Sequence, residues 1–262
     1  MNVKNDETKS PERLRGRVAI VTGAAQGIGR VIADRFAREG ATVMIADILA
    51  DKAQTTAEEI EKERGTHVYS FAGDLSQEEA ATALVQQTIK QCGQVDILVN
   101  NAGGGVILPF LEHTAETLQT TMNRNLWTTL WCCRAVLPHM VERRYGRIVN
   151  NGAESVRNGL WRHAAYNAAK GGVHGLTTGL AREFAPYGIT VNTIAPSATD
   201  TEGVAYWEKQ DPEYFNDIKS LIPMGRFAAM EEVAAAMAFV ASDEAAFITG
   251  QVLSINGGSS ML

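Results

Sequence analysis

The feature that most constrains this 262-residue chain is a glycine-rich turn between a β-branched run and an amphipathic stretch. The run is Val18–Val21, the turn is Thr22-Gly23-Ala24-Ala25-Gln26-Gly27-Ile28-Gly29, and the amphipathic stretch begins at Ile28. In a strand–turn–helix unit, glycines allow a tight turn and let the backbone approach a pyrophosphate, whose charge binds to free N–H groups at the helix N-terminus. The position of the turn therefore predicts a dinucleotide-binding unit rather than a purely structural loop.

The rest of the chain repeats this alternation of short runs and longer amphipathic segments. Seven runs are predicted as strands: Val18–Val21, Thr42–Ala46, His67–Phe71, Ile97–Val99, Arg147–Asn150, Thr190–Ile194 and Val252–Ile255. Six segments are predicted as helices: Ile28–Glu39, Asp51–Arg64, Gln77–Cys92, Thr114–Arg143, Ala164–Phe184 and Glu231–Ser242. Because each helix can connect two parallel strands, we expect a single Rossmann-type, doubly wound α/β domain whose seven-stranded parallel sheet has helices on both faces.

Composition narrows the possible partners. With 45% hydrophobic and 21% charged residues, the chain is typical of globular proteins. A formal net charge of −6 gives no reason to expect nucleic acid or an anionic membrane as a partner, and no stretch reaches the roughly 18 apolar residues of a membrane span. Cys92, Cys132 and Cys133 fit neither a disulfide framework nor a zinc spacing, so we expect no metal and a reducing, cytoplasmic compartment.

Two segments depart from the alternation. Residues 1–13 are polar and charged, and we expect them to form a disordered leader before a domain over residues 14–262. Residues 197–227 follow the sixth predicted strand and place Tyr206, Trp207, Tyr214 and Phe215 in a charged setting. An insertion at the carboxyl edge of a parallel sheet is where a substrate lid lies, so we predict a lid at about 197–227, with Trp207 near the substrate.

Acidic residues at predicted strand ends indicate which dinucleotide binds. Asp47 ends the second strand, 18 residues after Gly29, where a carboxylate accepts hydrogen bonds from the adenosine 2′-hydroxyl and repels a 2′-phosphate. It therefore favours NAD over NADP, in agreement with Gln26, which stands where a phosphate-binding Arg or Lys could lie. Asp74, which precedes Leu75, is placed to bind the adenine amine, and Asn101-Ala102-Gly103 brings small residues against the nucleotide.

Tyr166 and Lys170 are candidates for proton transfer. Their i, i+4 spacing near the start of a predicted helix places the hydroxyl and the ammonium on one face. A tyrosine with a pKa of about 10 is a poor base at neutral pH, but a nearby ammonium and an oxidised nicotinamide both favour its phenolate. The pair therefore indicates acid–base chemistry beside the nucleotide.

Together with Asn100–Gly103 and the ending Ile248-Thr249-Gly250-Gln251…Asn256-Gly257-Gly258, these motifs resemble the short-chain dehydrogenase/reductase family over about residues 14–262. The resemblance implies that Tyr166 is the general acid/base, that Lys170 lowers its pKa and holds the ribose, and that Asn125 anchors a water in a proton relay. It implies a homotetramer built through the helices around Thr114–Arg143 and Ala164–Phe184 and through the last strand. The expected cofactor contacts are Gly23, Gln26, Gly27, Ile28, Gly29, Asp47, Asp74, Leu75, Asn101, Ala102, Gly103, Tyr166, Lys170, Pro196, Thr199 and Thr201.

The chain departs from the family pattern at two positions. The family's usual serine, thirteen residues before the tyrosine, is replaced by Ala153, and the nearest hydroxyl belongs to Ser155. If the loop is shifted by two residues, Ser155 would donate a hydrogen bond to the substrate oxygen; otherwise the role is missing or is filled by Asn151, Glu154 or water. The second departure is Ser197, where a glycine usually follows the proline.

The loop before Tyr166 suggests the substrate. Arg157 or Arg162 could bind a substrate carboxylate and His163 could contact substrate, although loop arginines and helix-end histidines are often merely exposed. Within the family, the segments Leu130–Arg134 and Asn151–Leu160 resemble bacterial dehydrogenases that convert aromatic cis-dihydrodiol carboxylates to catechols. We therefore expect NAD-dependent oxidation of a secondary alcohol. A 3-oxoacyl-carrier-protein reductase, a sugar or polyol dehydrogenase, and a catalytically silent NAD-binding module remain alternatives.

Overall fold

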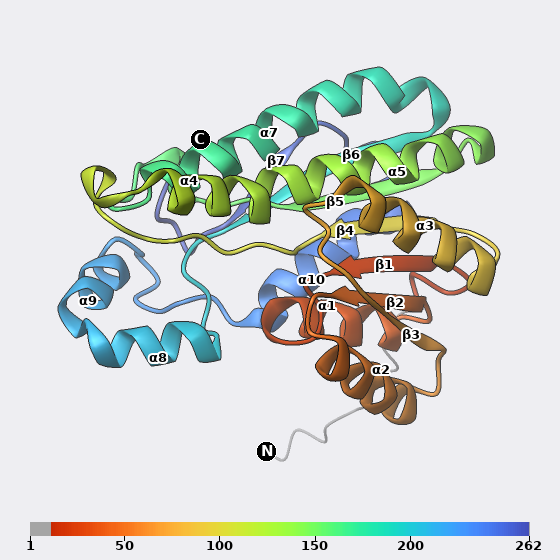
Figure 1. The fold of residues 1–262 in the computed structure, drawn as a ribbon, viewed down its shortest axis with the longest axis horizontal. Helices are drawn as coiled ribbons and strands as arrows, with labels where there is room; N and C mark the ends of the chain where they lie inside the picture. Colours follow the sequence, from red (N-terminus) through yellow and green to blue (C-terminus); the bar gives the residue numbers. More distant parts are fainter. Residues whose placement is uncertain (1–11, 262) are drawn as a thin grey trace, which may run out of the picture.

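The computed structural model describes residues 12–261, without the side chain of Trp207, so most of the expected N-terminal leader lies outside the described residues. Within this range seven strands form one sheet in the order β3-β2-β1-β4-β5-β6-β7, and every pairing is parallel (Figure 1). The strands are β1 (Val18–Thr22), β2 (Thr42–Asp47), β3 (Val68–Ala72), β4 (Ile97–Asn100), β5 (Gly146–Asn151), β6 (Ile189–Pro196) and β7 (Val252–Ile255). The predicted doubly wound sheet is confirmed.

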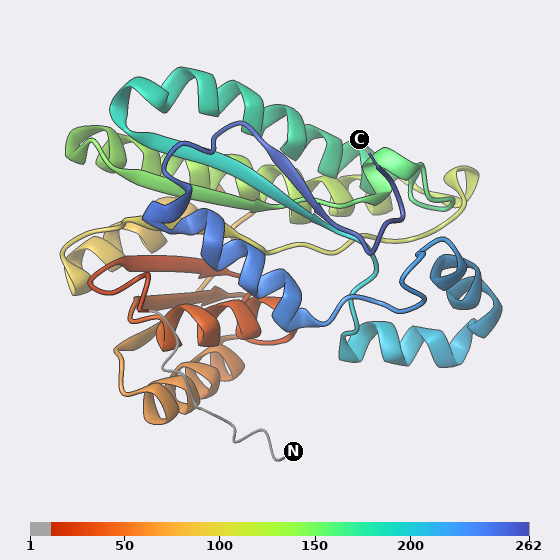
Figure 2. The same cartoon turned by 180° about the vertical axis from the view of Figure 1, so that it is seen from behind.

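Helices cover both faces of the sheet (Figures 1 and 2). One face carries α1 (Gly27–Arg38), α2 (Ala50–Arg64) and α10 (Met230–Ala241). The other carries α3 (Glu78–Cys92), α5 (Thr128–Arg143) and α7 (Ala164–Phe184). The shorter elements are α6 (Ser155–Asn158) and the 3-10 turns η1 (Phe110–Glu112), η3 (Ala185–Tyr187) and η4 (Asp243–Ala245). None of the helices between residues 12 and 261 is long and apolar enough to cross a membrane.

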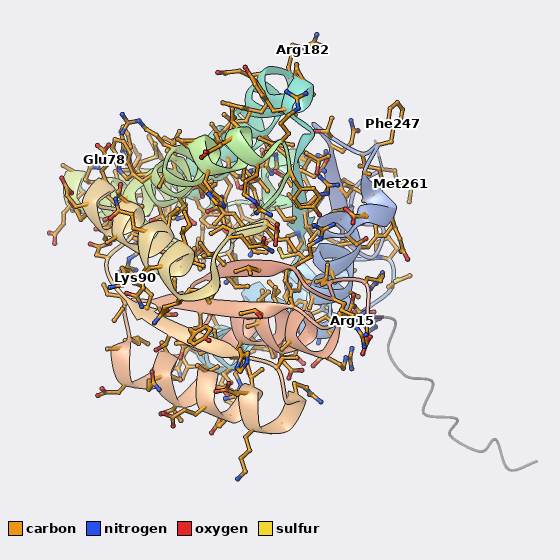
Figure 3. The ribbon with its side chains drawn as sticks, turned by 90° about the vertical axis from the view of Figure 1, so that its right-hand side faces the viewer. Arg15, Glu78, Lys90, Arg182, Phe247 and Met261 are labelled. Atoms are coloured by element: carbon orange, nitrogen blue, oxygen red, sulfur yellow. The ribbon has the colours of Figure 1, made fainter. Side chains whose placement is uncertain are left out.

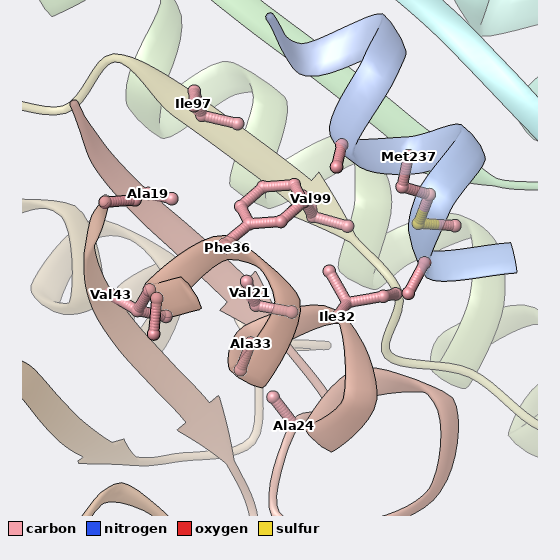
Figure 4. Packing of buried hydrophobic residues seen from close by; sticks show 14 of the residues in the cluster. Ala19, Val21, Ala24, Ile32, Ala33, Phe36, Val43, Ile97, Val99 and Met237 are labelled. Carbon is pink, nitrogen blue, oxygen red and sulfur yellow. The ribbon is translucent and has the colours of Figure 1, made fainter. Parts of the chain in front are cut away.

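The central strands read as continuous apolar runs because both of their faces are buried. In β1 every residue is buried, with Ala19 and Val21 packed toward α1 and Ile20 packed toward the opposite layer. Phe36 of α1 fills the space between these strands and Met237 of α10 (Figure 4). Burying a side chain of this size contributes about 1.5–3 kcal/mol. The apolar layers thereby hold the strand ends that carry the polar residues described below.

The strand order creates a crevice between β1 and β4. The chain leaves β1 toward β2 and β3 on one side, then returns to build β4 and the later strands on the other. At such a reversal, the loops after the two neighbouring strands separate and open a binding crevice at the carboxyl edge. The glycine-rich turn follows β1 and Asn101 follows β4, so the topology brings both to this crevice.

The segment Thr114–Arg143, predicted as one regular helix, is interrupted. It consists of α4 (Ala115–Met122), a π-helical turn η2 (Asn123–Trp127) and α5. The hydroxyl of Thr128 donates to the carbonyl of Asn123 at 3.0 Å, within the widened turn. Such π turns insert one residue into a helix and occur often at functional sites. Here the turn contains the fully buried Asn125.

The segment 197–227 forms two helices, α8 (Glu202–Gln210) and α9 (Pro212–Ser220), which project beyond one end of the sheet in both views (Figures 1 and 2). The Asp211 carboxylate caps α9 by accepting the Tyr214 N–H at 3.2 Å, and Pro212 occupies the first helical position. Tyr214, Ile218 and Ile222 follow at helical spacing and are buried in one small apolar cluster. This cluster holds the two helices against the loop before α7.

Candidate active site

A cleft of about 1690 Å³ opens at the carboxyl edge of the sheet. The glycine-rich turn, the loops after β2 to β6 and the helices α8 and α9 line it. Every residue predicted to contact the cofactor lies on its wall. Of the other predicted residues, Ser155 and His163 also line the cleft, whereas Asn125 is buried behind its wall.

The glycine-rich turn has the geometry of a phosphate-binding loop. Gly23 has a φ of +62°, and a Cβ at Gly29 would stand 2.1 Å from the Gly23 carbonyl oxygen, so neither position accepts a side chain without movement. A Cβ at Gly27 would meet nothing within 4 Å, which leaves bare backbone beside the cleft. The helix α1 begins there with no side-chain cap and no acidic residue in its first turn. Its N–H groups therefore suit an anionic phosphate.

Asp47 and Asp74 line the end of the cleft beside the glycine-rich turn, which is called the nucleotide end below. The Asp47 carboxylate accepts the N–H of Ala25, in the glycine-rich turn, at 3.0 Å and the N–H of Leu49 at 3.1 Å. Asp74 accepts the N–H of Ser76 at 3.0 Å. A carboxylate has about four acceptor positions, so each side chain is held in place and can still accept hydrogen bonds from a ligand.

A chain of hydrogen bonds joins the glycine-rich turn to Lys170. The Asn101 amide donates to the carbonyls of Thr22 and Gly23 at 3.0 and 3.1 Å. Its oxygen accepts from the Asn151 amide at 3.0 Å, and the carbonyl of Asn151 accepts from Lys170 Nζ at 2.6 Å. Because these residues come from the ends of β1, β4 and β5 and from α7, the chain positions Lys170 relative to the nucleotide end.

Tyr166 and Lys170 lie together at the start of α7. A Cβ at Gly105 would stand 2.7 Å from Tyr166 Cδ2, so the ring packs directly on that glycine. Lys170 Nζ is 5.8 Å from the centre of the Tyr166 ring. Burial raises the pKa of Tyr166 to about 12 and lowers the pKa of Lys170 to about 8. Burial therefore opposes the lowering of the Tyr166 pKa that was expected from Lys170. Without the charge of a bound cofactor, Tyr166 is mainly in its protonated phenol form at neutral pH.

Asn125 has a clear role in holding the loop after β4. Its amide oxygen accepts the Gly104 N–H at 3.2 Å, and its amide nitrogen donates to the carbonyls of Gly104 and Thr121 at 3.1 and 2.8 Å. Gly103 passes between Asn125 and Lys170, because a Cβ there would be 2.8 Å from Asn125 Oδ1 and 3.3 Å from Lys170 Nζ. The π turn thus fixes the loop beside Lys170, and a water relay at Asn125 stays a prediction.

The hydroxyl of Ser155 is committed to another partner. It donates to Asn167 Oδ1 at 2.6 Å, so the geometry gives no support to its taking the role of the usual serine. Glu154 is fully buried, and its carboxylate accepts the hydroxyls of Ser254, at 2.6 Å, and of Ser260. The position of the usual serine therefore carries only the methyl group of Ala153, at the wall of the cleft.

The three residues predicted to meet substrate, and Arg162, have different positions. Arg157 is absent from the cleft wall, since its guanidinium donates to Ser254 Oγ at 2.6 Å and to the Val252 carbonyl at 2.9 Å. It anchors the loop to β7 and does not serve as the predicted carboxylate ligand. Arg162 lines the cleft and pairs with Asp211 at 3.1 Å. His163 lines it too, while the side chain of Trp207 lies outside the described part of the chain.

Sequence reasoning missed much of the apolar wall. Lining residues that the sequence analysis did not name include Val106, Ile107, Leu108, Arg124, Ile218 and Ile222. The last two lie inside the predicted lid, and their spacing of i+4 and i+8 from Tyr214 predicts one face of a helix and could have identified them. Arg124 precedes the buried Asn125 and is exposed; its place on the wall depends on the π turn, which leaves no simple sequence signal.

Comparisons with known proteins agree with this geometry. Residues 23–260 match a family profile described as "Enoyl-(Acyl carrier protein) reductase". The chain belongs to the short-chain dehydrogenase/reductase family and is an oxidoreductase. It is 53% identical over 249 residues to 2,3-dihydroxy-2,3-dihydro-p-cumate dehydrogenase of Pseudomonas putida, an alignment that covers 95% of this chain and 96% of that protein.

Two further similarities extend the comparison. The chain is 38% identical to 1,6-dihydroxycyclohexa-2,4-diene-1-carboxylate dehydrogenase of Acinetobacter baylyi, with 95% of this chain and 98% of that protein covered. Among solved structures, an NAD+-bound xylitol dehydrogenase superposes with a TM-score of 0.89 at 30% identity, covering 94% of this chain and 99% of that one. The similarity to all three proteins spans nearly the whole chain.

The packing of Gly29 yields a first prediction. In Gly29→Ala the new methyl group must displace the Gly23 carbonyl and the Asn101 amide, so we expect the affinity for NADH to fall by about tenfold or more, as for the loss of one or two hydrogen bonds. Titration of NADH fluorescence measures this. The control is Gly175→Ala in α7, where a Cβ meets nothing within 4 Å. Equal affinities for both variants and the native protein would contradict the assigned turn.

Proposed function

We propose that this enzyme oxidises the cis-dihydrodiol of an aromatic carboxylic acid to a catechol, with NAD as the hydride acceptor. The names of the Pseudomonas and Acinetobacter relatives both describe ring diols that carry a carboxylate. The observation that carries the proposal is Arg162, an exposed guanidinium on the wall of the cleft, next in sequence to His163, whose ring packs against that of Tyr166. A cation at this place suits a substrate anion, which a sugar or polyol lacks.

The residues that line the cleft suit NAD as the cofactor. The glycine-rich turn would bind the phosphates, Asp47 the adenosine ribose, and Asp74 with Leu75 the adenine. The Asp47 carboxylate would repel a 2′-phosphate, which favours NAD over NADP. Two buried oxygens of cleft-lining residues, Asn151 Oδ1 and Ser259 Oγ, have no partner among the described residues. Unsatisfied buried groups of this kind are costly unless a ligand or water binds them.

The reaction needs a proton acceptor next to a hydride acceptor. Bound NAD supplies the hydride acceptor and, in its oxidised form, a positive charge. Tyr166 takes the proton of the reacting hydroxyl while its carbon loses a hydride. Where the neighbouring diol carbon carries a hydrogen, as in a 2,3-dihydrodiol of p-cumate, the ketone formed tautomerises to a catechol; a diol carbon that carries the carboxylate would instead lose CO2. Each diol thus gives one catechol, two electrons leave as hydride, and one proton reaches solvent past Lys170 and a water at Asn125. The Lys170 ammonium and the nicotinamide charge oppose the pKa of about 12 that burial imposes on Tyr166.

Residues 197–227 would act as the substrate lid. Phe215, Ile218 and Ile222 line the cleft and pack in one cluster with Leu160, and they form an apolar cover suited to a hydrocarbon ring. Arg162 uses one nitrogen to bond to Asp211, while a guanidinium has five N–H donors. The remaining donors can bind a carboxylate in a charge-assisted pair. Ring and anion would therefore be recognised by different parts of one cleft.

The proposal includes a homotetramer in the cytoplasm. Phe247 and Met261 project outward from the same side of the molecule as β7, and both are highly exposed (Figure 3). Trp127 stacks on Trp131 at the surface of the α4–α5 helix and is 40% exposed. Exposed apolar side chains in such groups support contacts between subunits. The three cysteines are all free thiols, which suits a reducing compartment.

A substrate panel tests the proposed function. We expect NADH formation from the cis-dihydrodiols of benzoate or p-cumate, with kcat/KM about tenfold or more above that for xylitol, for 3-oxoacyl thioesters in reverse, and for reactions with NADP. Reduction of the thioester with NADPH but no oxidation of the diol would contradict the proposal. Tight NADH binding without any turnover would favour a silent module.

The variant Tyr166→Phe tests the proton acceptor. It keeps the ring but loses the hydroxyl, so it should lower kcat for the diol by about 10² to 10⁴ with NADH affinity unchanged.

The carboxylate contact can be tested separately. In Arg162→Gln we expect KM for the diol acid to rise about 10- to 100-fold, as for the loss of one or two charge-assisted hydrogen bonds, while the uncharged cis-dihydrodiol of toluene reacts as before. The control is Arg226→Gln, because Arg226 pairs with Glu232 and does not line the cleft. Equal losses on the charged and uncharged diols would show that Arg162 does not bind the carboxylate.

A further inference from the structure

His163 stands beside the catalytic tyrosine but has no part in the chemistry described above. It is the residue before α7, and its side chain makes no cap to that helix. Its ring centre is 5.8 Å from that of Tyr166, with the two planes at 77°. Because residues at i and i+3 lie on the same side of a helical turn, both side chains reach the cleft from one side.

The hydrogen bonds of His163 determine which ring nitrogen carries the proton. Nδ1 lies 2.9 Å from the carbonyl oxygen of Trp161. A carbonyl only accepts, so Nδ1 carries the hydrogen and Nε2 of the neutral ring keeps a lone pair. The Tyr214 hydroxyl also lies 3.4 Å from Nδ1, so this nitrogen faces protein groups. Burial lowers the pKa of His163, which keeps the imidazole neutral at neutral pH.

The other nitrogen is available to a ligand. Within residues 12–261 no hydrogen bond of Nε2 is formed, and this nitrogen is not among the buried unpartnered atoms of that range. Since His163 lines the cleft, Nε2 presents an accessible acceptor there. The lid holds the ring in this orientation, because Tyr214 also packs edge-on against Trp161 at 5.8 Å and under the Arg162 guanidinium at 4.7 Å.

His163 Nε2 matters more because no free serine hydroxyl stands near Tyr166 at positions 153 and 155. Ala153 has no hydroxyl, and the hydroxyl of Ser155 is bonded to Asn167. A serine hydroxyl could donate to a carbonyl oxygen of any substrate. An imidazole nitrogen with a lone pair cannot donate, but it can accept from a substrate hydroxyl. The polar groups near Tyr166 are therefore complementary to a substrate that has a second hydroxyl next to the reacting one.

We propose that His163 Nε2 accepts a hydrogen bond from the second, non-reacting hydroxyl of a vicinal cis-diol and so makes the enzyme select diols over single alcohols. The inference rests on the proposed function in taking Tyr166 as the acceptor of the reacting hydroxyl's proton. Tyr166 and His163 approach from the same side of the cleft, and so they match two hydroxyls on the same face of a ring. A trans-diol would turn its second hydroxyl away from Nε2.

The first test compares His163→Phe with the native enzyme. Phenylalanine keeps an aromatic ring against Tyr166 but has no acceptor. We expect kcat/KM for a cis-dihydroxycyclohexane carboxylate to fall about tenfold, the loss of one hydrogen bond, while kcat/KM for the matching monohydroxy acid is unchanged. His163→Gln, whose amide oxygen can accept, should recover part of the loss. Equal losses on the diol and the single alcohol, or no recovery by glutamine, would contradict the inference.

A binding measurement separates this inference from the proposed function. Calorimetric titration of the NADH-loaded enzyme with cis-1,2-cyclohexanediol and with cyclohexanol requires no turnover. We expect the native enzyme to bind the diol about tenfold more tightly, and His163→Phe to bind both alike. Equal binding of both alcohols by the native enzyme would overturn the role of His163. Failure to oxidise a diol acid, with diol selectivity retained, would instead overturn the carboxylate-specific part of the proposed function.

Discussion

The hydrogen bonds of the Asn101 side chain are the interaction on which the rest of the site depends. They tie the ends of β1, β4 and β5 together through Thr22, Gly23 and Asn151, and the carbonyl of Asn151 then holds Lys170. Each bond contributes only about 0.5–1.5 kcal/mol, but an amide left unsatisfied in this place costs about 1–3 kcal/mol. These bonds therefore fix the position of Lys170 relative to the glycine-rich turn.

The regular elements could be predicted because their signals are local. Buried parallel strands appear as β-branched runs, and the glycine-rich turn, Asp47 and the Tyr166–Lys170 pair follow from their places at strand ends and at a helix start. Other features depend on contacts distant in sequence. The use of Arg157 as an anchor needs Ser254, 97 residues away, and the π turn around Asn125 accompanies a contact with Gly104. Neither contact leaves a periodic pattern in the sequence.

The electrostatics of Tyr166 explain why the proposed proton transfer needs the oxidised cofactor as well as the protein. Burial raises the pKa of the phenol to about 12, whereas the sequence suggested that Lys170 would lower it. The same burial lowers the pKa of Lys170 to about 8, so a smaller fraction of Lys170 is protonated than of an exposed lysine. A positive nicotinamide would favour both the phenolate and hydride departure. The proposed chemistry is thereby coupled to the presence of the oxidised cofactor.

The central claim is that this cleft converts a ring diol acid to a catechol by removing one hydride and one proton. The most direct measurement follows NADH by absorbance and the catechol product by chromatography in one reaction of the native enzyme with the 2,3-cis-dihydrodiol of p-cumate and NAD. The account predicts that the two products rise together in a 1:1 ratio. NADH without catechol, or no NADH from a protein that binds the cofactor, would contradict it.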